Sequence, residues 1–266
     1  MFNLTLFKRE VKSNYKMLLI FLGIVTMYST MIVAMFDPKL GESLELMAQS
    51  MPQIFSAFGM AKPSTTLIGF VGNYLYGFIL IVIPLIFIII LSNKLVARYV
   101  DRGSMAYLLA TPNKRRSIVV TQAIFSMVAI LLIVVYATVI CIVSSEIMFP
   151  GDLDIGRFIL INLGLYGLLF FFGGLCFLSS CCFNDGRLAN GVGAGLGVFF
   201  VLIQMISQVG DKFEFLKYIT PLTLFQPEKI ALGEGSPIGL FLILYAIGFV
   251  LYIGGIIIFN NKDLSI

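Results

Sequence analysis

Long runs of apolar residues, each separated from the next by a shorter polar segment, dominate the pattern along the chain. Six runs reach the length of about 20 residues that an α-helix needs to cross the hydrocarbon core of a bilayer. No Asp, Glu, Lys or Arg occupies the central part of any run, as expected of helices that cross lipid. The runs predict membrane spans at residues 17–36, 71–91, 118–145, 158–183, 188–209 and 238–260.

The polar segments carry patterns of their own. Residues 3–16 repeat apolar positions every three or four residues, which predicts an amphipathic helix lying in the membrane interface, although a simple basic flank of the first span has the same charges. Residues 42–58 place apolar residues at helical spacing, which predicts one or two short helices in a helical outer loop. Residues 210–237 place short apolar runs between prolines, which predicts a folded or re-entrant segment near the outer surface. The predicted fold class is an all-α membrane protein with one transmembrane domain over residues 1–266.

The composition agrees with this pattern, and the distribution of charge predicts how the chain is oriented in the membrane. Hydrophobic residues make up 59% of the chain and charged residues 12%, and the mean hydropathy is +1.00, which excludes an ordinary soluble domain. With six spans both termini lie on one side, and that side holds twelve of the 18 basic residues but four of the 14 acids. The positive-inside rule therefore predicts a multi-pass protein of the cell membrane with both termini in the cytoplasm. The basic pI of 8.8 reflects topology, and no nucleic-acid partner is expected.

Several kinds of chemistry are missing from the chain. It contains no histidine, which excludes Ser-His catalysis, His-based zinc sites and the HExxH pattern. It contains no GxxxxGK[ST] motif, so no ATP hydrolysis by this chain is expected, and no charged residue within a span offers an ion site. We therefore expect no catalytic residues, no metal and no cofactor in this chain, and an intramembrane enzyme is disfavoured. A polytopic membrane protein without these sites either draws its energy from outside its own chain or acts passively.

Neutral polar residues and glycines are the remaining candidates within the spans. Asn73, Tyr76, Gln204 and Ser207 are candidate contacts along a substrate path, or form hydrogen bonds between helices. A path without a ring of charges fits an amphipathic peptide, a hydrophobic drug or a lipid-like molecule better than a small ion. A proline in the middle of the second span, Pro84, predicts a kink. Two overlapping GxxxG pairs predict close helix packing, within one subunit or between two: Gly191 with Gly195, and Gly193 with Gly197.

A charged segment links the second and third spans on the side of the termini. It contains the runs Asp101-Arg102-Gly103-Ser104, Leu108-Leu109-Ala110-Thr111-Pro112 and Arg115-Arg116, in that order. This order resembles the first cytoplasmic loop of the type-two ABC exporter permeases, in the branch of drug, lantibiotic-immunity and sodium-extrusion permeases. The basic helix before the first span, the six spans, the outer run LMAQSMPQIFSAFG and the tail Lys262-Asp263-Leu264 extend the resemblance over nearly the whole chain.

The resemblance implies a permease subunit of an ATP-driven exporter. It implies two cytoplasmic P-loop ATPase subunits, which bind MgATP, and a second permease that is identical or similar. Spans two and five would flank the path, and residues 98–112 would form a coupling helix on the ATPase. The implied contacts are Arg98, Asp101, Arg102, Gly103, Tyr107, Leu108, Leu109 and Pro112.

Other basic residues fit the membrane surface, and one other function stays open. Lipid headgroups are the expected partners of Lys8, Arg9, Lys12, Lys16, Lys114, Arg115 and Arg116. The alternative function is a non-transport membrane subunit, such as a peptide sensor or an immunity scaffold.

Overall fold

The computed structural model describes residues 2–36, 46, 47, 49–59, 66–97, 115–183, 185–209, 211–234 and 237–261. Within these ranges the chain forms helices and no strand, and six helical segments are long and apolar enough to cross a membrane. The predicted all-α class and the number of six spans are confirmed. The spans are α1 (Leu4–Ala34), α5 (Ile79–Ser92) with the π-helical turn η1 (Asn93–Ala97), α8 (Arg115–Met148), α9 (Ile155–Cys182), α10 (Gly186–Ser207) and α12 (Ile238–Asn261).

Helix α9 is the centre of the bundle. It packs against α12, α10, α8 and α5, and 72% of its most apolar stretch is buried, against 28% for α10 and for α12. Its glycines permit close contact, because a Cβ on Gly174 would lie 2.9 Å from the carbonyl oxygen of Gly248 in α12. Small residues at such contacts let helix backbones approach in lipid, where packing rather than water exclusion drives association.

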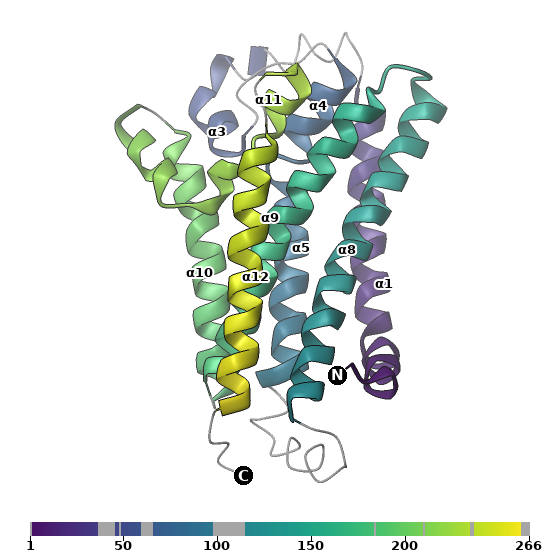
Figure 1. Ribbon diagram of the computed structural model, residues 1–266. Coiled ribbons are helices and arrows are strands. Elements are labelled where there is room, and N and C mark those ends of the chain that lie inside the picture. The colour runs from purple at the N-terminus through teal and green to yellow at the C-terminus, as the bar shows by residue number, and fades with distance from the viewer. Residues whose placement is uncertain are drawn as a thin grey trace.

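The two ends of the bundle differ in structure. The first turns of α1 and the last turns of α12 lie at one end, which we call the basic end, while short helices cover the opposite, capped end (Figure 1). These short helices are α3 (Pro52–Ala57), α4 (Leu67–Tyr74), η2 (Asp211–Tyr218), η3 (Pro221–Leu224) and α11 (Pro227–Leu232). Three of them begin with a proline, which suits the first position of a helix because its missing N–H has no helical partner there. The helical structure predicted for these loops is confirmed where the structure describes them.

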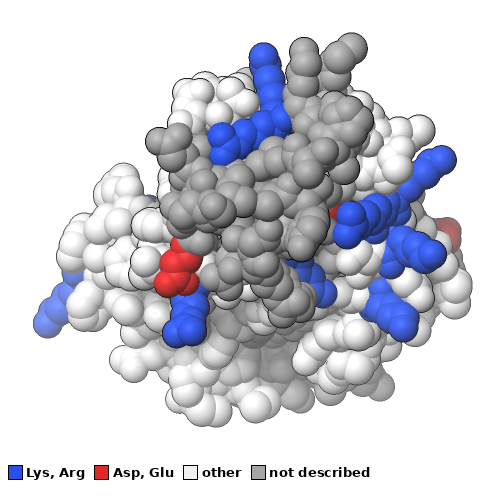
Figure 2. Space-filling model, turned by 90° about the horizontal axis from the view of Figure 1, so that it is seen from below, with Lys and Arg blue, Asp and Glu red and all other residues white. Residues whose placement is uncertain are grey.

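The basic end carries most of the described positive charge. Seen along the bundle, lysine and arginine side chains surround this end (Figure 2). The elements that meet there contribute Lys8, Arg9, Lys12, Lys16, Lys94, Arg115, Arg116 and Arg187. The charge asymmetry predicted from the sequence is therefore present in the folded chain.

Helix α1 combines the predicted interfacial helix and the first span in one uninterrupted helix of 31 residues. Its first turns lie across the basic end, and the rest runs along the bundle (Figure 1). Leu4, Val11 and Tyr15 are exposed on one side of these first turns, whereas Glu10 and Asn14 are buried on another. The apolar side is therefore free to face lipid while the polar side packs inward.

The second span begins later than the sequence predicts. Helix α4 ends at Tyr74, residues 75–78 form a turn, and α5 starts at Ile79, so the prediction of one helix over residues 71–91 is wrong. Pro84, where the sequence predicts a kink, lies inside uninterrupted α5. Gly77 lies in this break, where the carbonyl oxygens of Asn73 and Phe58 occupy the space that a side chain would need.

Candidate functional site

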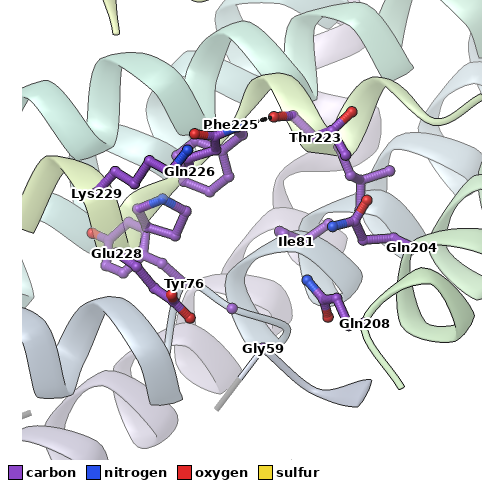
Figure 3. Close-up of a pocket in the computed structure, with 13 residues that line it drawn as sticks. Gly59, Tyr76, Ile81, Gln204, Gln208, Thr223, Phe225, Gln226, Glu228 and Lys229 are labelled. Carbon is purple, nitrogen blue, oxygen red and sulfur yellow. Dashed lines mark hydrogen bonds between the residues drawn. The ribbon is translucent and has the colours of Figure 1, made fainter. Parts of the chain in front are cut away.

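A cavity of about 180 Å³ opens at the capped end, beside the break in the second span. A cavity needs about 10–15 Å³ to hold a single water, so this one has room for a small organic group. Gln204 of α10 and Gln208, the residue after the end of α10, lie on one side, and Gln226, Glu228 and Lys229 lie on the other (Figure 3). Apolar side chains complete the wall: Ile81, Leu222, Phe225 and Pro227.

Gln204 and Gln208 form a polar pair in this wall. With the Gln208 amide assigned so that its nitrogen faces the carbonyl oxygens of Ser56 and Ala57, that nitrogen donates to them at 3.0 and 3.2 Å, and the Gln208 oxygen accepts from Gln204 Nε2 at 3.0 Å. The Gln204 nitrogen is thereby used, whereas Gln204 Oε1 is buried and has no hydrogen-bond partner among the described residues. An unsatisfied buried acceptor is unfavourable. This oxygen is covered by neighbouring atoms and does not form part of the accessible surface of the cavity.

Backbone forms the floor of the cavity where the second span is interrupted. Gly59 follows α3 with φ +73° and packs on Gly77, so that a Cβ on Gly59 would lie 3.3 Å from Gly77 Cα. A Cβ on Gly77 would lie 3.0 Å from the Phe58 carbonyl oxygen and would overlap that of Asn73. Both positions exclude larger residues. Non-helical backbone at this depth is tolerated where protein covers it or it lines a cavity, and both conditions hold here.

The four residues predicted along the substrate path fall into two groups. Tyr76 and Gln204 line the cavity, whereas Asn73 and Ser207 do not. The Ser207 hydroxyl donates to the Gln204 carbonyl oxygen at 2.7 Å, within α10. The Tyr76 hydroxyl donates to Asn162 Oδ1 at 2.8 Å, and Asn162 Nδ2 donates to the Phe158 carbonyl oxygen at 2.9 Å. Tyr76 therefore links the break in the second span to α9 and also contributes to the cavity wall.

We expect Tyr76→Phe to lower the free energy of unfolding by about 1 kcal/mol, because it leaves buried Asn162 Oδ1 without its donor. The measurement is the midpoint of heat-induced loss of monodisperse protein in detergent. Tyr218→Phe is the matched control, because that tyrosine is 82% exposed, and it should leave the midpoint unchanged. Equal midpoints for Tyr76→Phe and the native chain would show that the hydrogen bond contributes nothing.

Arg157 fastens the capped end to the central helix. Its Nη1 donates to the carbonyl oxygen of Ala231 in α11 at 3.1 Å, and its Nε lies 3.2 Å from Asp154 Oδ2. Gly233 ends α11 in the left-handed conformation, with the guanidinium about 3 Å from where a Cβ would be. Helix α11, which supplies Pro227, Glu228 and Lys229 to the cavity, is thus held on α9.

An ion pair lies earlier in the same loop, within η2. Lys217 donates a hydrogen bond to the Glu214 carboxylate, which lowers the pKa of Glu214 and raises that of Lys217. Both side chains are substantially exposed, so the pair contributes little to stability. The Thr223 hydroxyl donates to the Lys217 carbonyl oxygen at 2.7 Å and ties η2 to the cavity-lining segment.

The glycines of α10 face two directions. A Cβ on Gly193 would lie 3.3 Å from Cys176 Cα of α9, and one on Gly197 would lie 3.3 Å from Leu85 Cδ1 of α5. Gly191 and Gly195 have no neighbour within 4 Å of a Cβ in the described chain. One predicted GxxxG pair therefore packs within the subunit, and the other faces outward.

We expect Gly193→Leu to destabilise the protein by about 1–3 kcal/mol, because the side chain must push α10 away from α9. Gly191→Leu, two residues away on the open side of the helix, should fold like the native chain. Yield of monodisperse protein and its thermal midpoint compare the two variants. Equal losses for both would show that the packing assigned to Gly193 is wrong.

The predicted residues at the basic end are only partly described. Lys8, Arg9, Lys12 and Lys16 are exposed on α1 and Arg116 is exposed on α8, as suits contact with lipid headgroups. Arg115 instead lies with its guanidinium 5.7 Å from the centre of the Phe259 ring. Outside the described residues lie Arg98, Asp101, Arg102, Gly103, Tyr107, Leu108, Leu109, Pro112 and Lys114.

Sequence reasoning missed most of the polar cavity lining. Thr223, Gln226, Glu228 and Lys229 belong to a loop whose folding was predicted but whose polar residues were not considered, and Gln208 lies one residue beyond α10. The run Gln226-Pro227-Glu228-Lys229 within an otherwise apolar segment was the available signal. At the basic end, Glu10 was also missed: it is 2% exposed, and Asn14 Nδ2 donates to its Oε2 at 3.3 Å.

Comparison with known proteins assigns the fold to a family. No curated protein matches the chain. The sequence model of the family described as ABC-2 family transporter protein matches residues 14–264, from the first turns of α1 to beyond the end of α12. The match covers nearly the whole chain, including all six membrane-spanning segments and the cavity. The chain therefore belongs to the ABC-2 family of transporter proteins.

Proposed function

We propose that this membrane subunit of an ABC transporter is the permease of an exporter that moves amphipathic or hydrophobic substrates out of the cell. The family match over residues 14–264 carries the proposal, because a permease of this family works with an ABC ATPase. Two P-loop ATPase subunits, which bind MgATP, and a second permease complete the proposed complex. The positive-inside rule supports placing the basic end in the cytoplasm.

Energy would enter between α5 and α8. The chain leaves the bundle through η1, where Leu95 and Val96 are fully buried, and it re-enters at Arg115, which packs on Phe259 of α12. Both ends of the segment are thus fixed to the bundle. A push on residues 98–112 by the ATPase would be passed into α5, α8 and α12, and would shift the balance between two arrangements of the helices.

The substrate would pass along α5 and α10 and leave at the capped end. Ile81 of α5 and Gln204 of α10 both line the cavity there, which supports the predicted roles of the second and fifth spans. No Asp, Glu, Lys or Arg lies in the central part of a span, which supports a substrate that is amphipathic or apolar rather than a small ion. The capped end would face the outside.

Purification of the tagged chain with its native partners tests this function. We expect a P-loop ATPase, identified by mass spectrometry, to co-purify in a complex whose ATP hydrolysis is stimulated by hydrophobic peptides, drugs or lipids. A complex that contains a sensor kinase and no ATPase would contradict the proposal and would favour the non-transport alternative.

A further inference from the structure

The short helix that follows α10 leaves large apolar side chains uncovered. Phe213, Phe215 and Tyr218 of η2 and the next residue, Ile219, are all exposed, Phe215 to 63% and Tyr218 to 82%. This part of the chain extends to the side of the bundle, next to the end of α10 (Figure 1). Such a cluster on one short segment indicates a surface that contacts something other than water.

The spacing of these residues gives η2 two apolar faces. In a 3₁₀-helix, residues that are three apart lie above one another, so Phe215 and Tyr218 share one face. Phe213 and Ile219 share a second face with Leu216, because the Ile219 N–H donates to the Leu216 carbonyl oxygen at 3.0 Å and continues the turn. Apolar side chains therefore cover most of the circumference of η2.

Charged side chains lie among these apolar ones. Glu214 and Lys217 form an ion pair on the third face, and Lys212 is exposed one turn before Phe215. The core of an interface between proteins is depleted of charged residues, so a second permease does not suit this mixture. The boundary between lipid headgroups and acyl chains suits it, because it offers polar and apolar surroundings within a short distance and accommodates aromatic side chains.

The position of η2 in the chain places it at this boundary. Helix α10 ends at Ser207, and η2 begins at Asp211. Along α10, Phe199, Leu202 and Ile206 recur on one helical face and are exposed, as expected of a face that contacts lipid. The apolar surface of the span is thus followed directly by the apolar surface of η2, at the end where the span leaves the hydrocarbon core.

We propose that η2 is an interfacial anchor that binds the lipid leaflet at the capped end. Phe213, Phe215 and Ile219 insert among the upper parts of the acyl chains, and Lys212 lies near the headgroups. The ion pair between Glu214 and Lys217 neutralises the charged face, which lowers the cost of holding that face at the boundary.

The anchor is joined to the wall of the cavity. The Thr223 hydroxyl donates to the Lys217 carbonyl oxygen at 2.7 Å, and Thr223 lines the cavity. The Thr220 hydroxyl donates to the Phe200 carbonyl oxygen of α10 at 3.2 Å, which fixes the intervening chain to the span. The anchor therefore holds the cavity close to the depth of the lipid headgroups. That a substrate leaving the cavity enters this leaflet rests on the proposed function.

The depth of a single tryptophan tests the anchor. The chain contains no tryptophan, so Phe215→Trp introduces the only such fluorophore into the full chain reconstituted in phosphatidylcholine vesicles. Bromine atoms on the acyl chains quench tryptophan near their own depth, and iodide quenches it from water. We expect the strongest quenching from bromines about 5–10 Å below the headgroups. Phe213→Trp, on the other apolar face, should give the same profile and provides a second measurement where Phe215→Trp lowers the yield.

Two control positions bracket the expected depth. Leu232→Trp replaces an exposed residue of α11 at the same end and should be quenched by iodide and not by the brominated lipids. Phe199→Trp replaces an exposed residue of α10 about 12 Å before its end and should be quenched most by bromines near the bilayer centre. Quenching of both Phe215→Trp and Phe213→Trp by iodide alone, as in Leu232→Trp, would overturn the proposal.

Dilution with lipid separates the leaflet from a second permease. Quenching of Phe215→Trp by bromines that stays the same at every ratio of lipid to protein supports the anchor. Shielding from bromines and iodide at high protein density, which is lost on dilution, would assign η2 to an interface between copies and would contradict the proposal. The chain is measured without an ATPase, so a complex that fails to transport would sink only the export function, whereas a tryptophan in water would sink only the anchor.

Discussion

Gly103→Pro is expected to reduce substrate-stimulated ATP hydrolysis by the assembled complex about tenfold while the permease and the ATPase still co-purify. Proline fixes φ and removes a backbone donor, so the predicted coupling helix would lose its shape. The ends of the segment stay fixed by buried Leu95 and Val96 on one side and by Arg115 against Phe259 on the other. The bundle itself should therefore be unaffected.

A charge reversal with a matched control sharpens this expectation. Arg102→Glu should weaken coupling as Gly103→Pro does, whereas Arg187→Glu, an exposed arginine that also lies at the basic end, should leave it intact. The readout is the ratio of substrate-stimulated to basal ATP hydrolysis. Normal stimulation in both Gly103→Pro and Arg102→Glu would rule out the coupling role of residues 98–112.

Gly77→Val is expected to have the largest effect at the capped end. Its side chain would overlap the Asn73 carbonyl oxygen and crowd that of Phe58, which lies 3.0 Å from the Cβ position. Either the break in the second span straightens or α3 moves away, and both outcomes distort the cavity wall. We expect a loss of stability of about 1–3 kcal/mol, or more if neither segment can adjust, together with loss of transport.

The control for Gly77→Val is Gly239→Val. A Cβ on Gly239 in α12 has no described neighbour within 4 Å, and the same substitution adds the same volume there. Thermal midpoints in detergent and transport by the complex compare the two variants. If Gly77→Val matched Gly239→Val in both measurements, the turn at residues 75–78 would not be required.

The number and class of the spans could be predicted because helices in lipid satisfy their backbone groups internally, so long apolar runs suffice to locate them. The break in the second span could not, since Pro84 is the stronger local signal and residues 75–78 carry no charged side chain that would interrupt the apolar run. The break depends on contact with Phe58 and Gly59, which are distant in sequence and pack on Gly77.

Only part of the candidate site could be predicted from the sequence, because the rest also depends on contacts between distant segments. Tyr76 and Gln204 stood out as polar residues within spans, but their shared cavity depends on how η3 and α11 fold over the bundle. The glycine repeat of α10 shows the opposite case. Its spacing predicted close packing, and only the position of α9 distinguishes Gly193, which is packed, from Gly191, which is open.

Transport by the purified permease and its ATPase in proteoliposomes tests the central claim most directly. ATP supplied only outside the vesicles energises complexes whose ATPase faces outward, so an exporter should concentrate a fluorescent hydrophobic peptide amide inside the vesicles. We predict accumulation that requires ATP hydrolysis and is lost in Gly103→Pro. Accumulation without ATP, or ATP-driven movement from the lumen to the outside by these complexes, would contradict the account.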